Sequence, residues 1–224
     1  NTIIQGVWSI ILSTYRGESD VLFGGVISGR NPALKGIESM VGLFINTLPV
    51  RINVDLNKNL ITWLKEIQAD HLERDQYSYT PLVDIQEWSD IQRGTQLFEN
   101  ILVFENYPID RSLENGIAGI KIKNLKAVER TNFPLVILIA PGEGLTVKIV
   151  YETDKFDRIF IDQILKNFET LLNNISGDSV SKISDLSLLT DEEKKKILLE
   201  WNDTKHDFPS EKCVHRLFEE QADL

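Results

Sequence analysis

Residues 41–51 read Val41-Gly42-Leu43-Phe44-Ile45-Asn46-Thr47-Leu48-Pro49-Val50-Arg51. From Leu48 onward, apolar residues occupy every second position up to Val54, and the positions between them hold Pro49, Arg51 and Asn53. Such alternation with a period of two predicts a β-strand that buries one face. Because proline has no backbone N–H to give to a neighbouring strand, we expect this strand to lie at a sheet edge or to begin near Pro49.

The segment before this stretch is predicted to hold one helix, one strand and a loop. Residues 1–16 carry apolar side chains at helical spacing, and Gly17 is a typical stop for such a helix. Residues 20–28 are rich in apolar and β-branched side chains without helical spacing, which predicts a buried strand. A loop follows from Gly29 to about Gly42.

The segment after this stretch is predicted to contain two helices and four strands. Apolar residues recur every three or four positions in 59–75 and again in 157–175, which predicts two amphipathic helices. The last two strands are expected to form a hairpin through residues 141–144, which contain one proline and two glycines. Short apolar runs predict the strands at 101–104, 117–122, 135–140 and 145–151.

These elements predict an α/β fold class, in the form of an α+β sandwich with one mixed β-sheet covered by helices. The amphipathic helices near 1–16, 59–75 and 157–175 each need an apolar surface on which to bury one side. A shared sheet supplies that surface. We therefore expect a mostly β core covered by these three helices.

The composition argues against several classes of partner and site. With 24 Lys and Arg against 34 Asp and Glu, the chain has a net charge of -10, which argues against binding nucleic acid through its phosphates. Cys213 is the only cysteine in 224 residues, so an internal disulfide is impossible and a cytoplasmic location is expected. The apolar runs fall far short of the ~20 residues of a membrane span, so no membrane partner is expected.

Few residues predict a self-contained active site. The sequence has no glycine-rich phosphate loop and no paired histidines at metal-binding spacing, so the chain is expected to bind no metal or cofactor itself. His71 and Asp75 have the His-x-x-x-Asp spacing of chloramphenicol acetyltransferase-type enzymes, but the preceding His and the following Gly of that motif are absent. On a helix this spacing places both side chains on one face, which predicts a local ion pair or hydrogen bond.

Two arginines leave alternatives open. Arg30 follows Ser28 and Gly29, and Arg51 follows shortly after the Asn46-Thr47 pair. The guanidinium group carries a fixed fork of donors, so each arginine could anchor an anion or a backbone segment. The other interpretation is an arginine that stabilises its own loop without a ligand.

Residues 41–51 resemble a core motif of the condensation domains of nonribosomal peptide synthetases. The resemblance continues past residue 177, where residues 185–190 and 200–204 resemble the linker to an adenylation domain and residues 214–221 resemble the first helix of that domain. The remaining stretches that resemble the family are 20–24, 28–30, 36–40, 75–82 and 97–108.

The resemblance implies three parts of the chain. Residues 1–177 would be the carboxy-terminal lobe of a condensation domain, with a chloramphenicol-acetyltransferase-like fold. Residues 178–204 would be the condensation-adenylation linker, and residues 205–224 the truncated start of the adenylation domain. The family's catalytic motif, His-His-x-x-x-Asp-Gly, belongs to the amino-terminal lobe, so we expect no catalytic residue in this chain and no activity of the chain in isolation.

The implied function is a share in forming amide bonds between carrier-bound aminoacyl and peptidyl thioesters, within a synthetase that is a peptide-bond-forming acyltransferase. Peptidyl carrier proteins would bring the substrates on phosphopantetheine arms. The other implied partners are the amino-terminal lobe of the same domain and the adjacent adenylation domain. Without that lobe, the chain is also expected to associate with itself.

By the same resemblance, the chain supplies the wall and floor of a substrate tunnel. The loop between residues 28 and 41 would cross beneath the tunnel, and residues 116–131 would reach over the other lobe. One segment departs from the family pattern, since Arg74 replaces a His or Asn and is followed by Asp75 and Gln76 in swapped order. The tunnel residues implied by the resemblance are Ser28, Gly29, Arg30, Gly42, Asn46, Thr47 and Arg51.

Two other functions fit the same sequence. One is a truncated module that binds carrier proteins without chemistry, and an upstream His-His-x-x-x-Asp-Gly motif in the parent gene would argue against it. The other is a lobe of a related acyltransferase or epimerase-like domain, which the adenylation-like tail disfavours.

Overall fold

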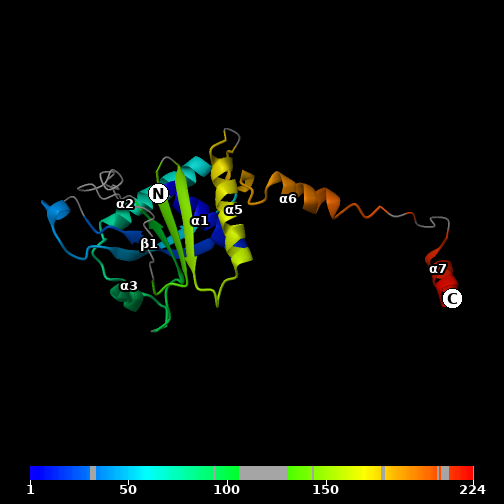
Figure 1. Ribbon diagram of the computed structural model, residues 1–224, viewed down its shortest axis with the longest axis horizontal. Helices are drawn as coiled ribbons and strands as arrows, with labels where there is room; N and C mark the ends of the chain where they lie inside the picture. Colours follow the sequence, from blue (N-terminus) through cyan, green and yellow to red (C-terminus); the bar gives the residue numbers. More distant parts are fainter. Residues whose placement is uncertain are drawn as a thin grey trace, which may run out of the picture. The chain divides into compact units, whose positions relative to one another are not determined.

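The computed structural model of the chain describes residues 1–30, 34–92, 94–105, 131–142, 144–177, 180–205, 207 and 212–223. The chain divides into two compact units, Asn1–Leu188 and Leu189–Leu224 (Figure 1). The predicted strand at 117–122 lies outside the described residues.

A five-stranded mixed sheet forms the centre of the first unit, in the order β2-β1-β3-β4-β5. The outer pairs β1–β2 and β4–β5 are antiparallel, whereas β3 runs parallel to both β1 and β4. The register pairs Pro141 with Leu145, which confirms the predicted hairpin. The strands are β1 (Asp20–Ile27), β2 (Asn46–Asn53), β3 (Asn100–Phe104), β4 (Leu135–Pro141) and β5 (Leu145–Tyr151).

Three helices cover one face of this sheet, as predicted (Figure 1). They are α1 (Thr2–Arg16), α2 (Leu60–Asp75) and α5 (Arg158–Ile175). Trp8 of α1 lies at the centre of the core, where its ring stacks on Phe168 with centroids 5.8 Å apart and its Nε1 donates to Asn100 Oδ1 at 2.9 Å. The stripes of the three helices therefore share one apolar core, as their spacing required.

The helix ends follow from identifiable local residues. Helix α1 ends at Gly17, which has a φ of 71° that costs a glycine little. The side chain of Asn59 caps α2 by accepting from the Thr62 N–H, and that of Asp157 caps α5 by accepting from the Phe160 N–H. Each cap satisfies a backbone donor that the first turn of a helix leaves free.

A smaller apolar cluster covers the opposite face of the sheet. Phe98 and Phe133 stack there with centroids 5.5 Å apart, over Ile101, Val136 and Leu138. Gly24 of β1 makes room for the ring of Phe98, because a Cβ at that position would lie 2.3 Å from it.

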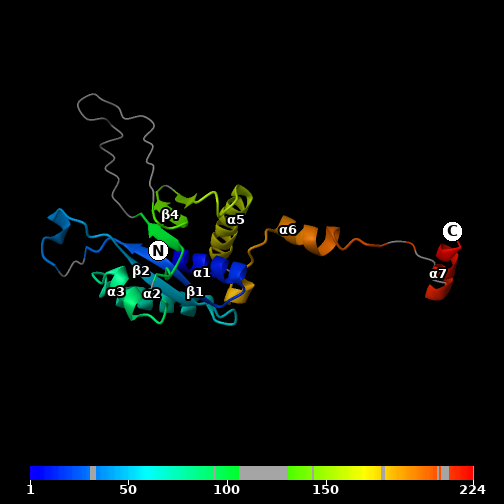
Figure 2. The same ribbon diagram turned by 90° about the horizontal axis from the view of Figure 1, so that it is seen from below.

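The short helix α3 (Leu82–Trp88) was absent from the sequence prediction and lies beside β2 (Figures 1 and 2). It has no buried residue, so it lacks the apolar stripe that reveals a helix in a sequence.

Strand β2 confirms the interpretation of Pro49. The strand lies at one edge of the sheet, and Pro49 pairs with Gly24 of β1. The strand begins at Asn46, two residues earlier than its alternating pattern, because Asn46 and Thr47 pair with Ile27 and Val26 while remaining half-buried.

Residues beyond 177 still pack on the first unit. Ile183 is buried, its N–H donates to the Lys58 carbonyl at 3.1 Å, and the Leu60 N–H donates to the Ser181 carbonyl at 2.9 Å. Leu186 and Leu188 join the same core. The unit therefore runs to Leu188, and the division of the family's domains at residue 177 stays a prediction.

The second unit contains two helical segments. Helix α6 (Asp191–Lys195) begins with a capping box between Thr190 and Glu193 and continues as a π-helix over Lys196–Glu200. Helix α7 (Val214–Ala222) follows near the end of the chain, with Val214 and Phe218 largely exposed.

Candidate functional site

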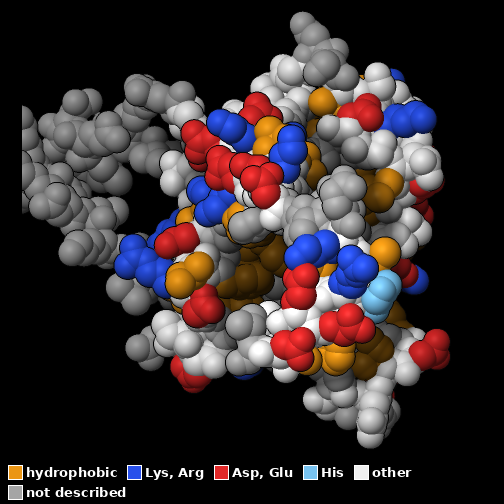
Figure 3. All heavy atoms as spheres, turned by 90° about the vertical axis from the view of Figure 1, so that its right-hand side faces the viewer, with side chains coloured by type: hydrophobic (Ala, Val, Ile, Leu, Met, Phe, Trp, Pro, Cys, Tyr) orange, Lys and Arg blue, Asp and Glu red, His pale blue; other side chains and the backbone are white. Residues whose placement is uncertain are grey.

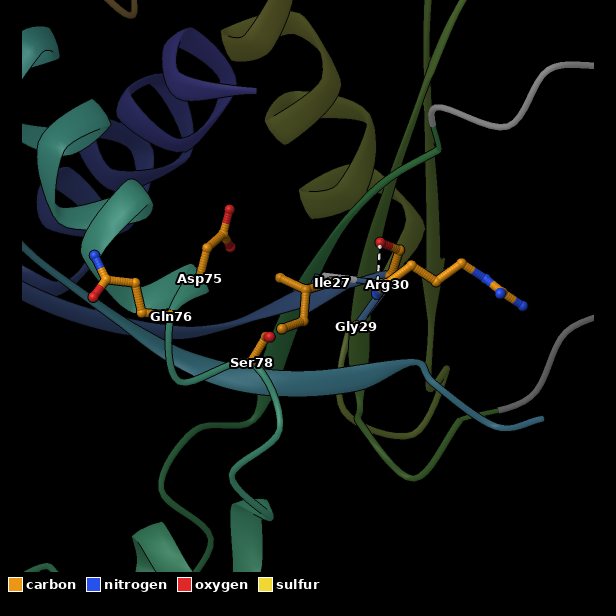
Figure 4. Close-up of a pocket in the computed structure, with 7 residues that line it drawn as sticks. Ile27, Gly29, Arg30, Asp75, Gln76 and Ser78 are labelled. Atoms are coloured by element: carbon orange, nitrogen blue, oxygen red, sulfur yellow. Dashed lines mark hydrogen bonds between the residues drawn. The ribbon is translucent and has the colours of Figure 1, made fainter. Parts of the chain in front are cut away.

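The candidate site is a hollow of about 280 Å³ at the end of β1, which we call the Ser28–Asp75 pocket (Figure 4). One wall comes from the residues that end β1, and the other comes from the last turn of α2 and the turn after it. The fold thus brings two stretches that resemble family motifs to one place. The pocket is lined by Ile27, Ser28, Gly29, Arg30, Asp75, Gln76 and Ser78.

Arg30 holds the loop that follows the pocket. Its guanidinium group donates to the carbonyl oxygen of Ile37 and, at 3.1 Å, to that of Met40. The same group lies 4.6 Å from the centre of the Phe44 ring. These contacts match the second of the two sequence alternatives, because both carbonyls and the aromatic ring belong to the loop that Arg30 itself begins.

Gly29 is required by the path of this loop. Its φ is 63°, and a Cβ at this position would lie 1.8 Å from the carbonyl oxygen of Phe44. The backbone therefore approaches itself closely enough to exclude any side chain, in a conformation that glycine adopts without strain.

Asn46 ties β2 to the pocket wall. Its Nδ2 donates to the carbonyl oxygens of Ser78 at 2.9 Å and Thr80 at 2.7 Å, while its Oδ1 accepts from the Thr47 N–H at 2.8 Å. The amide is thus fully used between protein groups. Asn46 shapes the pocket by fixing the turn that carries Ser78, without lining the hollow itself.

We expect Asn46→Ala to lower the free energy of unfolding by about 1–3 kcal/mol, since two half-buried carbonyls lose their donor. Urea unfolding followed by circular dichroism measures this loss. Asn53→Ala, on the same strand but with an exposed side chain, is the matched control and is expected to cost about 0.5 kcal/mol or less. Equal losses in the two variants would contradict the assigned role of Asn46.

The other predicted tunnel residues do not line this pocket. Thr47 lies in β2 opposite Val26, and Gly42 lies in the exposed loop against the Phe44 ring. Arg51 projects from β2 toward Asp20, with its Nε and Nη2 donating to the carboxylate at 2.6–3.1 Å. The pKa of Asp20 is lowered by this hydrogen bonding, which marks Arg51 as half of an exposed ion pair.

The predicted helix-face contact between His71 and Asp75 is confirmed. His71 Nε2 lies 3.8 Å from Asp75 Oδ2, and its Nδ1 lies 3.4 Å from a guanidinium nitrogen of Arg74. Burial lowers the pKa of His71, and the charge of Asp75 only partly opposes that effect. The imidazole is therefore mostly neutral at neutral pH.

The loop between Gly29 and Asn46 exposes apolar side chains to solvent, while the contacts of Arg30 fix its backbone. Within this loop the side chain of Ile37 is buried, and its own carbonyl accepts from Arg30. Exposed apolar side chains on an anchored loop are typical of an interaction surface. The large apolar residues exposed here are Leu34, Met40, Val41, Leu43 and Ile45.

Surface charges of both signs are interspersed on the face drawn in Figure 3, with no single basic field. Within the described part of the chain, no helix is long and apolar enough to cross a membrane. The cytoplasmic location stays a prediction.

The comparison with known families identifies the chain. Residues 1–198 match the condensation domain family. The chain belongs to this family. In nonribosomal peptide synthetases, condensation domains form the peptide bond between carrier-bound substrates.

Several peptide synthetases are similar in sequence. A linear gramicidin synthase from Brevibacillus parabrevis has a subunit that is 43% identical over 223 residues, which are 100% of this chain and 4% of that protein. Bacitracin synthase 3 from Bacillus licheniformis is 37% identical over 224 residues, which cover 99% of this chain and 4% of that protein. The chain therefore spans a small fraction of the curated relatives that it matches.

Solved structures share the fold. A four-domain nonribosomal peptide synthetase bound to AMP and glycine superposes with a TM-score of 0.77 at 14% identity, covering 99% of this chain and 18% of that chain. The X-domain in its complex with OxyB from teicoplanin biosynthesis gives a TM-score of 0.67 at 17% identity, covering 85% of this chain and 42% of that one. The predicted condensation-type fold is confirmed.

Four residues that line the pocket are absent from the predicted site residues. Ile27 lines it from the end of β1, and Asp75, Gln76 and Ser78 line it from the end of α2 and the following turn. The sequence does contain a signal for the last three, because residues 75–82 resemble a family motif. Asp75 was instead interpreted as the helix-face partner of His71. These three residues could have been predicted from the fact that a stretch resembling a family motif lies at the end of a predicted helix.

Proposed function

We propose that the first unit forms one half of a condensation site, in which an aminoacyl amine attacks a peptidyl or aminoacyl thioester. The observation that carries the proposal is the Ser28–Asp75 pocket, where two stretches that resemble the family's motifs meet at an open hollow. The family match over residues 1–198 supports the reaction class. An open hollow on one lobe fits a site that a second lobe completes.

The reaction balances without a cofactor in this chain. The amine nitrogen forms a bond to the thioester carbonyl carbon, the carbon–sulfur bond breaks, and the proton lost by nitrogen ends on the thiolate. We infer that both acyl groups arrive as substrates on phosphopantetheine arms of peptidyl carrier proteins. The proton-transferring histidine would belong to the amino-terminal lobe, so this chain contributes by holding the reacting groups in place.

The residues of the pocket divide between lining and support. Ser28 and Asp75 offer polar side chains to a ligand, whereas Arg30 and Asn46 fix the backbone around them. Among the residues predicted for the tunnel, Ser28, Gly29 and Arg30 are supported by this geometry. Gly42, Thr47 and Arg51 are not among the residues that line the pocket.

We also infer the partners from surfaces of the chain. The apolar side chains of the loop between Gly29 and Asn46 would pack on the amino-terminal lobe of the same domain, which removes them from water. Val214 and Phe218 of α7 would likewise pack in an adenylation domain that follows.

The test is amide formation from carrier proteins charged with a donor and an acceptor. The isolated chain is expected to give no product above background, because no histidine is among the described residues that line the pocket. The chain joined to the amino-terminal lobe from its own reading frame is expected to give product. His71→Ala is the control, and it should leave that product unchanged.

Two outcomes would contradict the proposal. One is turnover by the isolated chain that disappears in His71→Ala, since the reaction would then need no second lobe. The other is failure of the joined lobes to form product although both are folded and both carriers are charged.

A further inference from the structure

We propose that Asp75 is the binding residue for the protonated α-amino group of the acceptor aminoacyl substrate in the Ser28–Asp75 pocket. The inference rests on the proposed function, because it names the substrate group that the pocket would hold. The ligand class is a primary ammonium group next to a carbonyl.

The charged groups of the pocket are unequally available to a ligand. Asp75 and Arg30 are the two charged side chains among its described lining residues. The guanidinium of Arg30 is engaged by the carbonyls of Ile37 and Met40 and by the ring of Phe44. Figure 4 shows the side chains of Asp75 and Arg30 pointing in different directions. The carboxylate is thus left as the charge available to a ligand.

The groups next to Asp75 leave its carboxylate accessible. Its side chain is 48% exposed, so solvent and ligands reach it. The contact with His71 at 3.8 Å is too long for a strong hydrogen bond, and burial keeps that imidazole mostly neutral by lowering its pKa. Arg74 attracts the carboxylate but directs a guanidinium nitrogen toward His71. Both oxygens of Asp75 therefore keep accepting capacity for a ligand.

The acceptors of the pocket match an ammonium group, which carries three donors and no acceptor. Asp75 and Ser28 line one hollow, and the carboxylate and the hydroxyl can both accept, whereas Figure 4 shows the amide of Gln76 pointing away from Ile27 and Arg30. A hollow of about 280 Å³ is also close to the lower limit of pockets that bind small molecules, about 300 Å³.

A metal ion fits this site less well than an ammonium group. The pocket holds one carboxylate, and no group of three or more His, Cys, Asp or Glu side chains that could hold a metal ion occurs in the described part of the chain. Divalent cations bind through several oxygen ligands with more than one carboxylate in most sites. An organic cation with directed donors matches a single carboxylate flanked by a neutral acceptor.

The chemistry gives Asp75 a binding role and not that of a base. An adjacent carboxylate raises the pKa of a bound amine, because it stabilises the charged form. The bound amine would therefore stay protonated until a base of the other lobe removes its proton. Asp75 would increase the occupancy of the acceptor site and leave proton transfer to that base.

The experiment is an NMR titration of the full 224-residue chain at pH 7 with L-alaninamide, whose amine is mostly protonated there because α-amino groups have a pKa of about 8. The expected result is a set of amide shifts confined to residues 27–30 and 75–78. N-acetyl-L-alaninamide, which lacks the ammonium group, is expected to cause none of them. Asp75→Asn should weaken L-alaninamide binding about fivefold, as expected for one partly exposed ion pair. Asp75→Glu, which keeps the charge, should restore part of the affinity.

Asp90→Asn is the matched control, because it removes a carboxylate outside the pocket, and its binding should equal that of the wild type. Equal shifts with the acetylated compound, equal binding by Asp75→Asn, or no shift in the wild type would each overturn the inference.

The outcome is distinguishable from failure of the proposed function. In the chain joined to its amino-terminal lobe, Asp75→Asn should raise KM for the acceptor thioester with little change in kcat. Amide formation with an unchanged KM would overturn the role of Asp75 and leave the proposed function intact. Binding of L-alaninamide without any amide formation by the joined lobes would overturn the proposed function and keep the ammonium site.

Discussion

Replacing Trp8 by alanine is expected to lower the free energy of unfolding of the first unit by about 3–5 kcal/mol. Trp8 is 1% exposed, stacks on Phe168 and donates its indole N–H to Asn100. The variant leaves a cavity between α1 and α5 and removes the donor that satisfies Asn100. Urea unfolding monitored by far-UV circular dichroism measures the change without relying on tryptophan fluorescence.

The control for this variant is Trp88→Ala. Trp88 lies at the end of α3 and is 73% exposed, so its removal should cost about 0.5 kcal/mol or less. If Trp8→Ala lowered the free energy of unfolding by less than about 1 kcal/mol, the described packing of α1 on α5 would be contradicted.

Gly29→Ala is expected to destabilise the chain by about 2 kcal/mol or more. A non-glycine residue in the left-handed region costs about 1–2 kcal/mol, and the clash with the carbonyl of Phe44 adds to it. Because the obstacle is backbone, the loop must move to accept a methyl group. Amide signals of the loop between Gly29 and Asn46 should shift in the NMR spectrum, together with the loss in unfolding free energy.

Gly17→Ala separates the two causes. Gly17 has a similar φ of 71°, but a Cβ there would meet nothing within 4 Å. It should therefore cost about 1–2 kcal/mol, the part due to backbone conformation alone. If Gly29→Ala cost no more than Gly17→Ala, the close approach of Phe44 to Gly29 would be refuted.

Helices and strands that bury one face on the core could be predicted from the sequence. Helix α5 and the β4–β5 hairpin agree with their expected ranges to within one residue at each end. In both cases apolar side chains repeat at the period of the element, because one face lies on the core. Helix α3 escaped prediction since it has only 7 residues and none of them is fully buried.

The candidate site was predictable only in part. Ser28, Gly29 and Arg30 were found through their resemblance to the family, whereas Asp75 was assigned to a contact with His71 and Ser78 received no role. The pocket depends on the distance between the end of β1 and the end of α2, and no local pattern encodes that distance. The two arginines show the same limit, because Asp20 and the carbonyl of Ile37 became identifiable as partners only in three dimensions.

The parallel placement of β3 has a kinetic consequence. Gly24 of β1 pairs with Ile101 of β3, so β2, α2 and α3 are all synthesised between two strands that must become neighbours. Proteins dominated by such distant pairings have high contact order and fold slowly. We expect the β4–β5 hairpin to form before β3 has paired with β4. Until that pairing is made, the edge of β4 is open to strands of other molecules. Slow translation and low temperature should therefore raise the soluble yield of this chain more than stabilising its finished core would.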